Sequence, residues 1–255
     1  MKFCVSNRQS DTVLKKANEI SVPFKDQDTI PDLALKNPGA DIIVRISAED
    51  VDEIDWDKFK KLARELPIIF CTEDITIDKK CKINNIPFYW AFPITSYYEL
   101  KGLNYIGVSQ FLLGPPLSFD LQLIKERFGR PIRLIANVCF DNYINQKDGI
   151  CGSYVRPEDV IKYEKYVDSL EFARVTKDQE EVLFRVYAED RTWPGNLRLL
   201  LTNFMYDVDN RGIPNEFAEA RMNCRQNCMR TGTCKFCYTA VNFGNVMDNY
   251  VHRKV

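Results

Sequence analysis

The chain has 255 residues and a formal net charge of −1, from 35 basic and 36 acidic side chains. Hydrophobic residues make up 45% and charged residues 28%, the balance of a soluble globular protein. The length suits one large domain, and the near-zero charge does not predict whole-chain attraction to nucleic acid or acidic membranes.

Apolar runs such as YIGVSQFLLG are far shorter than the roughly 20 residues of a membrane span. The start MKFCVSNRQSD lacks the apolar segment of a signal peptide. We therefore expect a cytoplasmic protein that has no membrane segment.

Short apolar runs alternate with amphipathic segments along the first 175 residues or so. The runs, each expected to form a strand, are 2–6, 41–46, 67–71, 87–92, 105–109, 132–137 and 167–173. Their apolar character is continuous and not alternating, which indicates strands buried on both faces, as in a parallel sheet. An eighth strand is not settled by this pattern, and 197–204 is one candidate.

The segments between these runs predict helices. One spans 10–20 and opens with Ser10 or Asp11 as a cap, and a second spans 56–66 and stops before Pro67. A third spans 117–129, with Ser118 as a cap and a terminating Gly129. A fourth spans 156–167 and places a proline in its first turn.

This alternation predicts an α/β fold, a (β/α) TIM-type barrel that is either complete or lacks a strand. An open doubly wound sheet is the alternative, but CVSNRQSD after the first strand contains no glycine for a phosphate-binding loop. We expect the barrel to occupy residues 1–210 and a cysteine-rich, metal-binding segment to occupy 211–255, packed on the barrel.

Barrel enzymes place their active sites at the C-terminal ends of the strands. Polar residues follow several predicted strands, and we take four as candidate catalytic residues: Arg45, Glu73, Asn137 and Arg174. The remaining candidates at this mouth are Asn7, Arg8, Ser47, Thr72, Pro93, Ser109, Gln110 and Cys139. Such a mouth suits an anionic or hydrogen-bonding ligand, although any one of these side chains can simply satisfy loop backbone groups.

Histidine chemistry is nearly absent from the chain. The single histidine is His252, so a Ser-His-Asp triad, a Cys-His dyad and a three-histidine zinc site lack their parts. A carboxylate pair such as Glu73 and Glu171 stays open, but acids are too common here for this to be specific.

Four of the nine cysteines lie within fourteen residues near the end of the chain: Cys224, Cys228, Cys234 and Cys237. A reducing cytosol disfavours a disulfide framework, and thiolates select zinc or iron–sulfur clusters. The C-x3-C-x5-C-x2-C spacing favours a [4Fe–4S] cluster, with zinc as the alternative. Cys139 and Cys151 are candidate additional ligands, whereas Cys4 and Cys71 are expected in the core.

Four stretches give the chain a likeness to a known group of proteins: YIGVSQFLLGPPLSFDLQLIKERFG, RPIRLIANVCFDN, GSYVRPEDVIKYEKYVDSLEFA and WPGNLRLLL with the cysteine-rich segment after it. Over roughly residues 100–240 the chain resembles the collagenase-like peptidase family, which includes iron–sulfur proteins of oxygen-independent hydroxylation. After Cys139 the family commonly has a second cysteine close by, and FDNYINQKDGI has none.

The resemblance implies a barrel with a [4Fe–4S] cluster on four cysteines. It also implies roles in hydroxylating ubiquinone precursors, transfer RNA or ribosomal RNA, often with a partner protein. Our first hypothesis is therefore an iron–sulfur barrel protein that modifies an RNA, quinone or peptide substrate or assists a partner that does, with a protein partner or as a homo-oligomer. One alternative is a non-catalytic interaction module with a structural zinc or iron–sulfur site. A peptidase-like hydrolase is the third reading, and no activated nucleophile supports it.

Overall fold

The strands form one sheet that curves round on itself. The computed structural model describes residues 1–114, 117, 120–138, 154–202 and 208–222. Eight strands lie in the order β5-β4-β3-β2-β1-β8-β7-β6, and all paired neighbours are parallel. Their bounds are β1 Lys2–Ser6, β2 Glu19–Pro23, β3 Asp41–Ile46, β4 Ile68–Thr72, β5 Phe88–Trp90, β6 Phe111–Leu113, β7 Ile132–Ile135 and β8 Ser169–Glu171.

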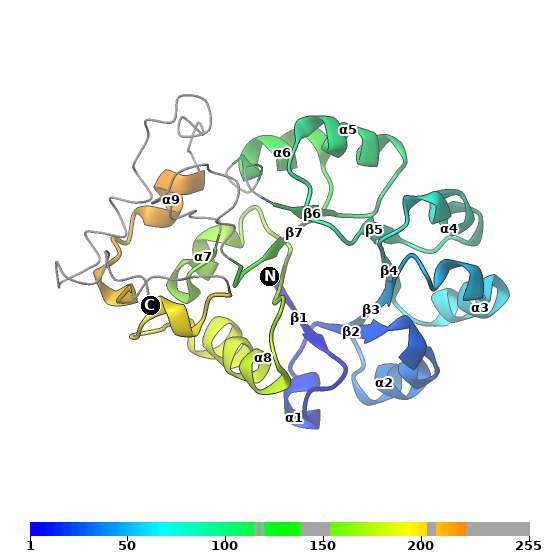
Figure 1. Cartoon of the computed structure of the whole chain (residues 1–255), viewed down its shortest axis with the longest axis horizontal. Coiled ribbons are helices and arrows are strands. Elements are labelled where there is room, and N and C mark those ends of the chain that lie inside the picture. The colour runs from blue at the N-terminus through cyan, green and yellow to red at the C-terminus, as the bar shows by residue number, and fades with distance from the viewer. Residues whose placement is uncertain (115–116, 118–119, 139–153, 203–207, 223–255) are drawn as a thin grey trace.

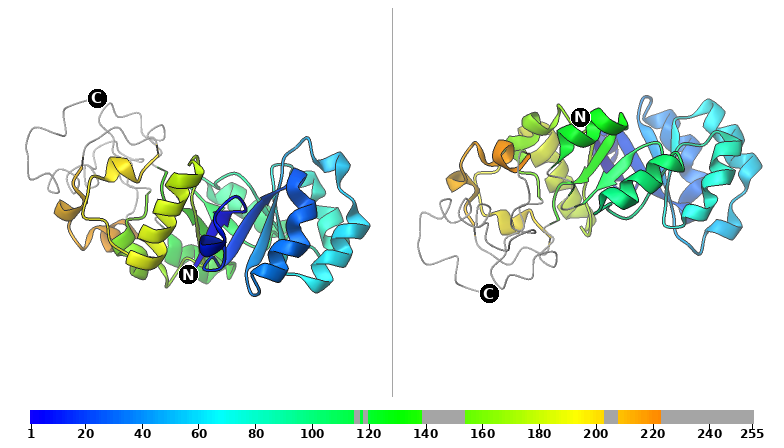
Figure 2. Two further views of the ribbon diagram at one scale, coloured as in Figure 1. Left: turned by 90° about the horizontal axis from the view of Figure 1, so that it is seen from below. Right: turned by 90° about the horizontal axis from the view of Figure 1, so that it is seen from above.

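Helices cover the outside of this sheet, and the views in Figures 1 and 2 agree on that arrangement. The α-helices are α1 Asp11–Leu14, α2 Ile30–Lys36, α3 Trp56–Glu65, α4 Asp78–Asn84, α5 Tyr97–Tyr105, α6 Leu121–Phe128, α7 Val160–Tyr163, α8 Lys177–Phe184 and α9 Phe217–Met222. Short 3₁₀ turns include Phe24–Thr29, Val51–Glu53, Ile75–Ile77, Pro157–Asp159, Leu197–Leu199 and Asn210–Gly212, and a π-helical turn spans Arg185–Asp190. Within the described ranges no helix has the length and apolar character to cross a membrane.

The barrel is nearly closed, and its seam lies between β5 and β6. The Ser109 N–H donates to the Phe88 carbonyl at 2.7 Å, and the Ile94 N–H donates to the Leu112 carbonyl at 2.8 Å. The Gly114 N–H returns to the Ile94 carbonyl at 2.9 Å. A Cβ at Gly114 would lie 2.8 Å from the Cβ of Pro93, so a side chain there would push the seam apart.

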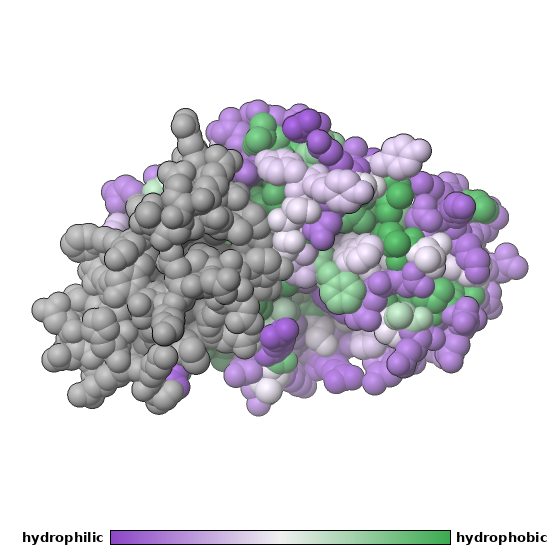
Figure 3. Space-filling view, turned by 45° about the horizontal axis from the view of Figure 1, so that its top comes forward, coloured by the Kyte–Doolittle hydropathy of each residue, from purple (hydrophilic) through white to green (hydrophobic). Residues whose placement is uncertain are grey.

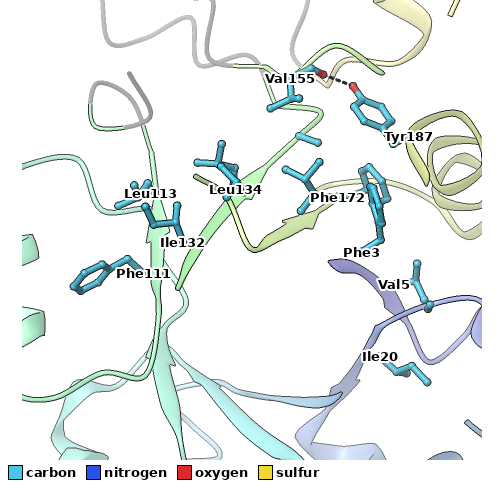
Figure 4. Packing of buried hydrophobic residues seen from close by; sticks show 14 of the residues in the cluster. Phe3, Val5, Ile20, Phe111, Leu113, Ile132, Leu134, Val155, Phe172 and Tyr187 are labelled. Atoms are coloured by element: carbon cyan, nitrogen blue, oxygen red, sulfur yellow. Dashed lines mark hydrogen bonds between the residues drawn. The ribbon is translucent and has the colours of Figure 1, made fainter. Parts of the chain in front are cut away.

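The main core lies between the sheet and the helices. Outward-facing strand residues such as Phe3, Val5, Ile20 and Ile132 are buried there (Figure 4). On β6, the Phe111 ring meets the Phe128 ring of α6 edge-on, with centroids 5.8 Å apart. A second buried cluster of inward-facing residues, Cys4, Ile43, Cys71, Tyr89 and Leu112, covers much of the other face, so most strands read as continuous apolar runs.

The inside of the barrel contains charge. Arg133 of β7 is fully buried, and its Nη2 lies 2.7 Å from Oε2 of Glu19 on β2. Its Nη1 lies 3.5 Å from Oε2 of Glu171 on β8, and its guanidinium lies 5.0 Å from the centroid of the Tyr89 ring. Ser169 donates a 2.5 Å hydrogen bond to Glu19. Two carboxylates therefore compensate the buried arginine from two sides.

The barrel prediction is confirmed, and the strands at 2–6, 41–46, 67–71, 87–92, 132–137 and 167–173 are present with small shifts of their ends. The helix predicted over 56–66 runs from Trp56 to Glu65. The helix predicted over 117–129 begins later, at Leu121, and ends at Gly129 in the left-handed region with φ of 62°. Its expected cap at Ser118 lies outside the described residues. The segment 156–167 forms a 3₁₀ turn and then only the short α7.

The helix predicted over 10–20 is wrong in its second half. It ends at Leu14, and β2 begins at Glu19 as the strand that the sequence pattern missed. β2 places Glu19 and Ser21 inside the barrel, where Arg133 and Arg45 bind them. These polar side chains interrupt the apolar run that otherwise marks a strand.

Two other strand predictions are also wrong. Residues 105–109 contain the last residue of α5 and the loop after it, where Gly107 has a φ of 76°, and β6 follows at Phe111. In the described part of the candidate eighth strand at 197–204, residues 197–199 form a 3₁₀ turn, Leu197–Leu199, and Thr202 makes a single bridge to Val138; residues 203 and 204 lie outside the described residues. The first of these runs is apolar because Ile106 and Val108 pack on the core in the loop that leads to β6, whereas Tyr105 is exposed.

A segment close to the end of the described chain packs against residues 154–159. The buried Arg156 pairs with Asp159 at 2.5 Å and donates to the carbonyls of Ile213 and Pro214. Arg221 of α9 donates to the Tyr154 carbonyl. These contacts hold residues 213–222 against the body, while residues 223–255 lie outside the described part of the chain.

We predict that Arg133→Met lowers the free energy of unfolding by about 3–5 kcal/mol, because Glu19 would remain buried without a cationic partner. Lys16→Met, which breaks the exposed 2.5 Å pair with Glu189, is the matched control and should cost about 1 kcal/mol or less. Urea unfolding of both variants measures the difference. Equal small losses would contradict the role given to Arg133.

Candidate functional site

A pocket of about 750 Å³ opens at the C-terminal ends of β1, β2, β3 and β8. Its charged lining residues are Arg8, Arg45, Arg174, Lys177, Glu171 and Glu180. Four cations against two carboxylates give this region a positive balance, although the whole chain has a net charge of −1. This is the end of a barrel where ligands bind.

Arg45 connects the pocket to the charged interior. Its Nη2 lies 3.2 Å from Oε2 of Glu171, the same oxygen that Arg133 approaches from below. Its Nε donates to the hydroxyl of Ser21 at 2.6 Å, and its Nη1 lies 3.6 Å from the sulfur of Cys71. These contacts fix the guanidinium plane in place while 38% of the side chain remains exposed. Arg45 is therefore held rigidly at the floor of the pocket.

Three further cations on the rim have no acidic partner. Among the described residues, no carboxylate lies within ion-pair distance of Arg8, Arg174 or Lys177. Arg174 also has a φ of 57°, a left-handed conformation that is uncommon for a residue with a side chain. Lys177 begins α8, whose N-terminus adds a partial positive charge on the same side. The rim is therefore suited to bind an anion.

Glu180 is a buried acid in the same pocket, held by neutral donors. Its Oε1 accepts from the Ser6 N–H at 3.0 Å, and its Oε2 accepts from Nε2 of Gln9 at 2.5 Å. Burial raises the pKa of Glu180, although the hydrogen bonds from Gln9 and Ser6 and the charge of Arg45 act against that rise. These bonds clamp α8 to the end of β1.

Of the four candidate catalytic residues, Arg45 and Arg174 line this pocket. Asn137 is fully buried at the end of β7 and acts as a clamp, because it accepts from the Ala173 N–H at 2.9 Å and donates to the Ala173 carbonyl at 3.0 Å. Glu73 is exposed after β4 and does not line the pocket, so the suggested pairing of Glu73 with Glu171 has no support here.

The other predicted mouth residues have structural contacts. Ser47 donates to Asp50, Thr72 donates to the Asp74 carbonyl, and Ser109 donates to the Phe88 carbonyl. Arg8 is the exception and lines the pocket, whereas Asn7 and Pro93 lie in the turns after their strands. Gln110 is buried, and its Nε2 has no hydrogen-bond partner among the described residues.

The described cysteines are buried, protonated thiols. Burial raises the pKa of Cys4 and of Cys81 to about 12, and it also raises the pKa of Cys71. All three are free, and within the described part of the chain no group of three or more His, Cys, Asp or Glu side chains could hold a metal ion. The predicted ligands Cys224, Cys228, Cys234 and Cys237, with Cys139 and Cys151, lie outside the described residues.

Sequence reasoning missed four residues of this site: Gln9, Lys177, Glu180 and the supporting Arg133. Glu180 and Gln9 belong to a helix and a loop, so listing the residues that follow strands could not find them. Arg133 carried a usable signal, because a lone arginine inside the apolar run PIRLIAN requires a buried acid.

No known protein family and no curated protein matches this sequence. The solved structure of the U32 peptidase Mk0906 is similar to it with a TM-score of 0.46 and 13% sequence identity. The similarity covers 69% of this chain and 94% of that one. This level of similarity is too low to show a family or to transfer a ligand or an activity.

We predict a specific pH dependence of stability from Glu180. Because its pKa is raised in the folded chain, the folded state keeps this proton at pH values where the unfolded state has lost it. The stabilisation is complete below the ordinary glutamate pKa of about 4.3 and is lost as pH rises through the folded-state value.

In the Glu180→Gln variant the side chain at position 180 cannot titrate. As pH rises from about 4 to 7, the free energy of unfolding of the unmodified chain should therefore fall relative to that of the variant. Chemical unfolding at a series of pH values measures this difference. Glu181→Gln, an exposed neighbour on α8, should keep the pH profile of the unmodified chain. A difference between Glu180→Gln and the unmodified chain that does not change with pH would contradict the assignment.

Proposed function

We propose that this protein is a barrel protein that binds an anionic ligand at the mouth and carries a [4Fe–4S] cluster on Cys224, Cys228, Cys234 and Cys237. In this proposal it acts in, or assists, the oxygen-independent hydroxylation or modification of an RNA, quinone or peptide substrate. The observation that supports anion binding is the 750 Å³ pocket, whose rim cations Arg8, Arg174 and Lys177 have no acidic partner among the described residues.

The chemistry of the thiols supports the ligand set. A thiolate, and not a thiol, binds metal, so the protonated Cys4, Cys71 and Cys81 are poor ligands. The remaining cysteines include the four closely spaced ones, which match the number that a [4Fe–4S] cluster requires. When bound, such a cluster supplies electron transfer; zinc on the same thiolates would supply only a structural crosslink.

A peptidase-like hydrolase finds no support in the described residues. The chain has no histidine before His252, so Ser6 and Ser21 beside the pocket have no imidazole base within residues 1–222. The protonated thiols Cys4 and Cys71 are not nucleophiles at neutral pH.

A protein partner or a second copy of the chain is part of the proposal. Tyr98 and Tyr105 of α5 are seven residues apart, on one face of the helix, and are 88% and 89% exposed. Exposed tyrosines are frequent at binding surfaces. On the face that Figure 3 shows, apolar and weakly polar residues gather toward the middle of the coloured part, with hydrophilic residues around them.

We predict that anaerobically purified protein contains iron and absorbs near 400 nm, and that each of the four Cys→Ser substitutions removes most of the iron. Cys4→Ser and Cys81→Ala are the matched controls and should keep it, since both thiols are buried and protonated. Elemental analysis is the measurement. One zinc per chain and no iron would favour the non-catalytic module with a structural zinc site.

We predict that 4-methylpentanoate, a carboxylate with a short apolar chain, binds the pocket. Arg174→Gln should weaken its binding about tenfold, because a charge-assisted hydrogen bond is lost. Isothermal titration calorimetry measures both affinities. Lys101→Gln removes an exposed lysine of α5 outside the pocket and should leave the affinity unchanged. If both substitutions weakened binding equally, the loss would come from the overall charge of the protein and not from a contact with Arg174.

A further inference from the structure

The pocket contains unpaired charges of both signs. Among the described residues, Arg8, Arg174 and Lys177 form no ion pair with an acid, and Glu180 forms none with a cation, although the charge of Arg45 acts on it from a distance. Glu171, the other carboxylate in the lining, is occupied by Arg45 and Arg133. Glu180 is thus the acid of this pocket that remains available to a cation.

Neutral groups hold Glu180 and do not neutralise it. The Ser6 N–H and the Gln9 amide each donate one hydrogen bond to its carboxylate, and 7% of the residue is exposed. A buried carboxylate without a directly paired cation is costly, and an incoming cation would relieve that cost. The geometry of the site leaves this position for a group that comes with the ligand.

Gln9 adds an unused acceptor at the same place. Its Nε2 donates to Glu180 and to the Lys177 carbonyl, at 2.5 and 3.0 Å, and these bonds fix the orientation of its amide. Its Oε1 is buried and has no hydrogen-bond partner among the described residues. Buried acceptors are rarely left unpaired, and a protonated amine of a ligand has donors for both Gln9 and Glu180.

We propose that the mouth binds a small zwitterionic ligand of the α-amino acid type. This inference rests on the anion-binding site proposed above and names the class of its ligand. The rim cations Arg8, Arg174 and Lys177 bind its carboxylate, and Glu180 with Gln9 binds its ammonium group. Val175, a partly exposed apolar residue of the lining, contacts an aliphatic side chain. The 750 Å³ volume lies within the range of small-molecule sites.

Both sides of the ligand are bound by elements that already contact each other. Arg8 and Gln9 lie in the loop after β1, Arg174 and Lys177 lie in or next to the loop after β8, and Glu180 belongs to α8. β1 and β8 are neighbours in the sheet, and Figure 1 shows α8 beside β1. The Glu180 bonds to Ser6 and Gln9 join these segments before any ligand arrives, so the site is preorganised.

Three related compounds separate the two charges of the ligand: L-leucine, 4-methylpentanoate, which lacks the amine, and 3-methylbutylamine, which lacks the carboxylate. Calorimetric titration of the full chain at pH 7.5 should show L-leucine binding at least about tenfold more tightly than either analogue. Glu180→Gln should remove that advantage and leave the affinity for 4-methylpentanoate within about twofold. Glu181→Gln should change neither value.

The outcomes distinguish the two proposals. If 4-methylpentanoate binds and L-leucine binds no more tightly, the ammonium site is overturned and the anionic site stands. If Glu180→Gln leaves the preference for L-leucine intact, Glu180 is not the amine ligand and the inference is overturned. If neither compound binds at millimolar concentration, both the inference and the anionic site of the proposed function are overturned.

Discussion

The buried ion pair of Arg133 with Glu19 and Glu171 is the constraint on which the rest of this barrel depends. A fully buried guanidinium requires acidic partners, and the two carboxylates come from β2 and β8, strands that are not adjacent to each other in the sheet. The interaction therefore crosses the barrel interior and selects the register that brings the three strands into range. The apolar core outside the sheet stabilises the strands, but it is not specific in this way.

The same network reaches the functional end. Glu171 is shared by Arg133 below and Arg45 above, so charge at the pocket floor is connected to charge in the interior. Because Glu171 is already neutralised, it does not cancel the rim cations, and the mouth remains positive. A structural ion pair thus sets the electrostatics of the pocket, and its residues do not need to contact a ligand to influence binding.

The sequence predicted the barrel and most strands, because strands covered by helices must be apolar on that face. It missed β2, because Glu19 and Ser21 point into a charged interior and break the pattern. Residues after strands gave Arg45 and Arg174 but not Glu180 and Gln9, which approach from a helix and a loop. Ion pairing between polar side chains depends on the three-dimensional fold. The spacing of residues along the sequence therefore could not predict that Glu180 forms no ion pair.

A crystal structure of the full chain with L-leucine, prepared without oxygen, tests the central claim most directly, namely that the unpaired charges of the mouth form one ligand site. We expect the ligand carboxylate within about 3 Å of a guanidinium of Arg8 or Arg174 and the ammonium nitrogen within about 3 Å of the Glu180 carboxylate. An empty mouth at saturating ligand, or a ligand bound elsewhere, would contradict the account.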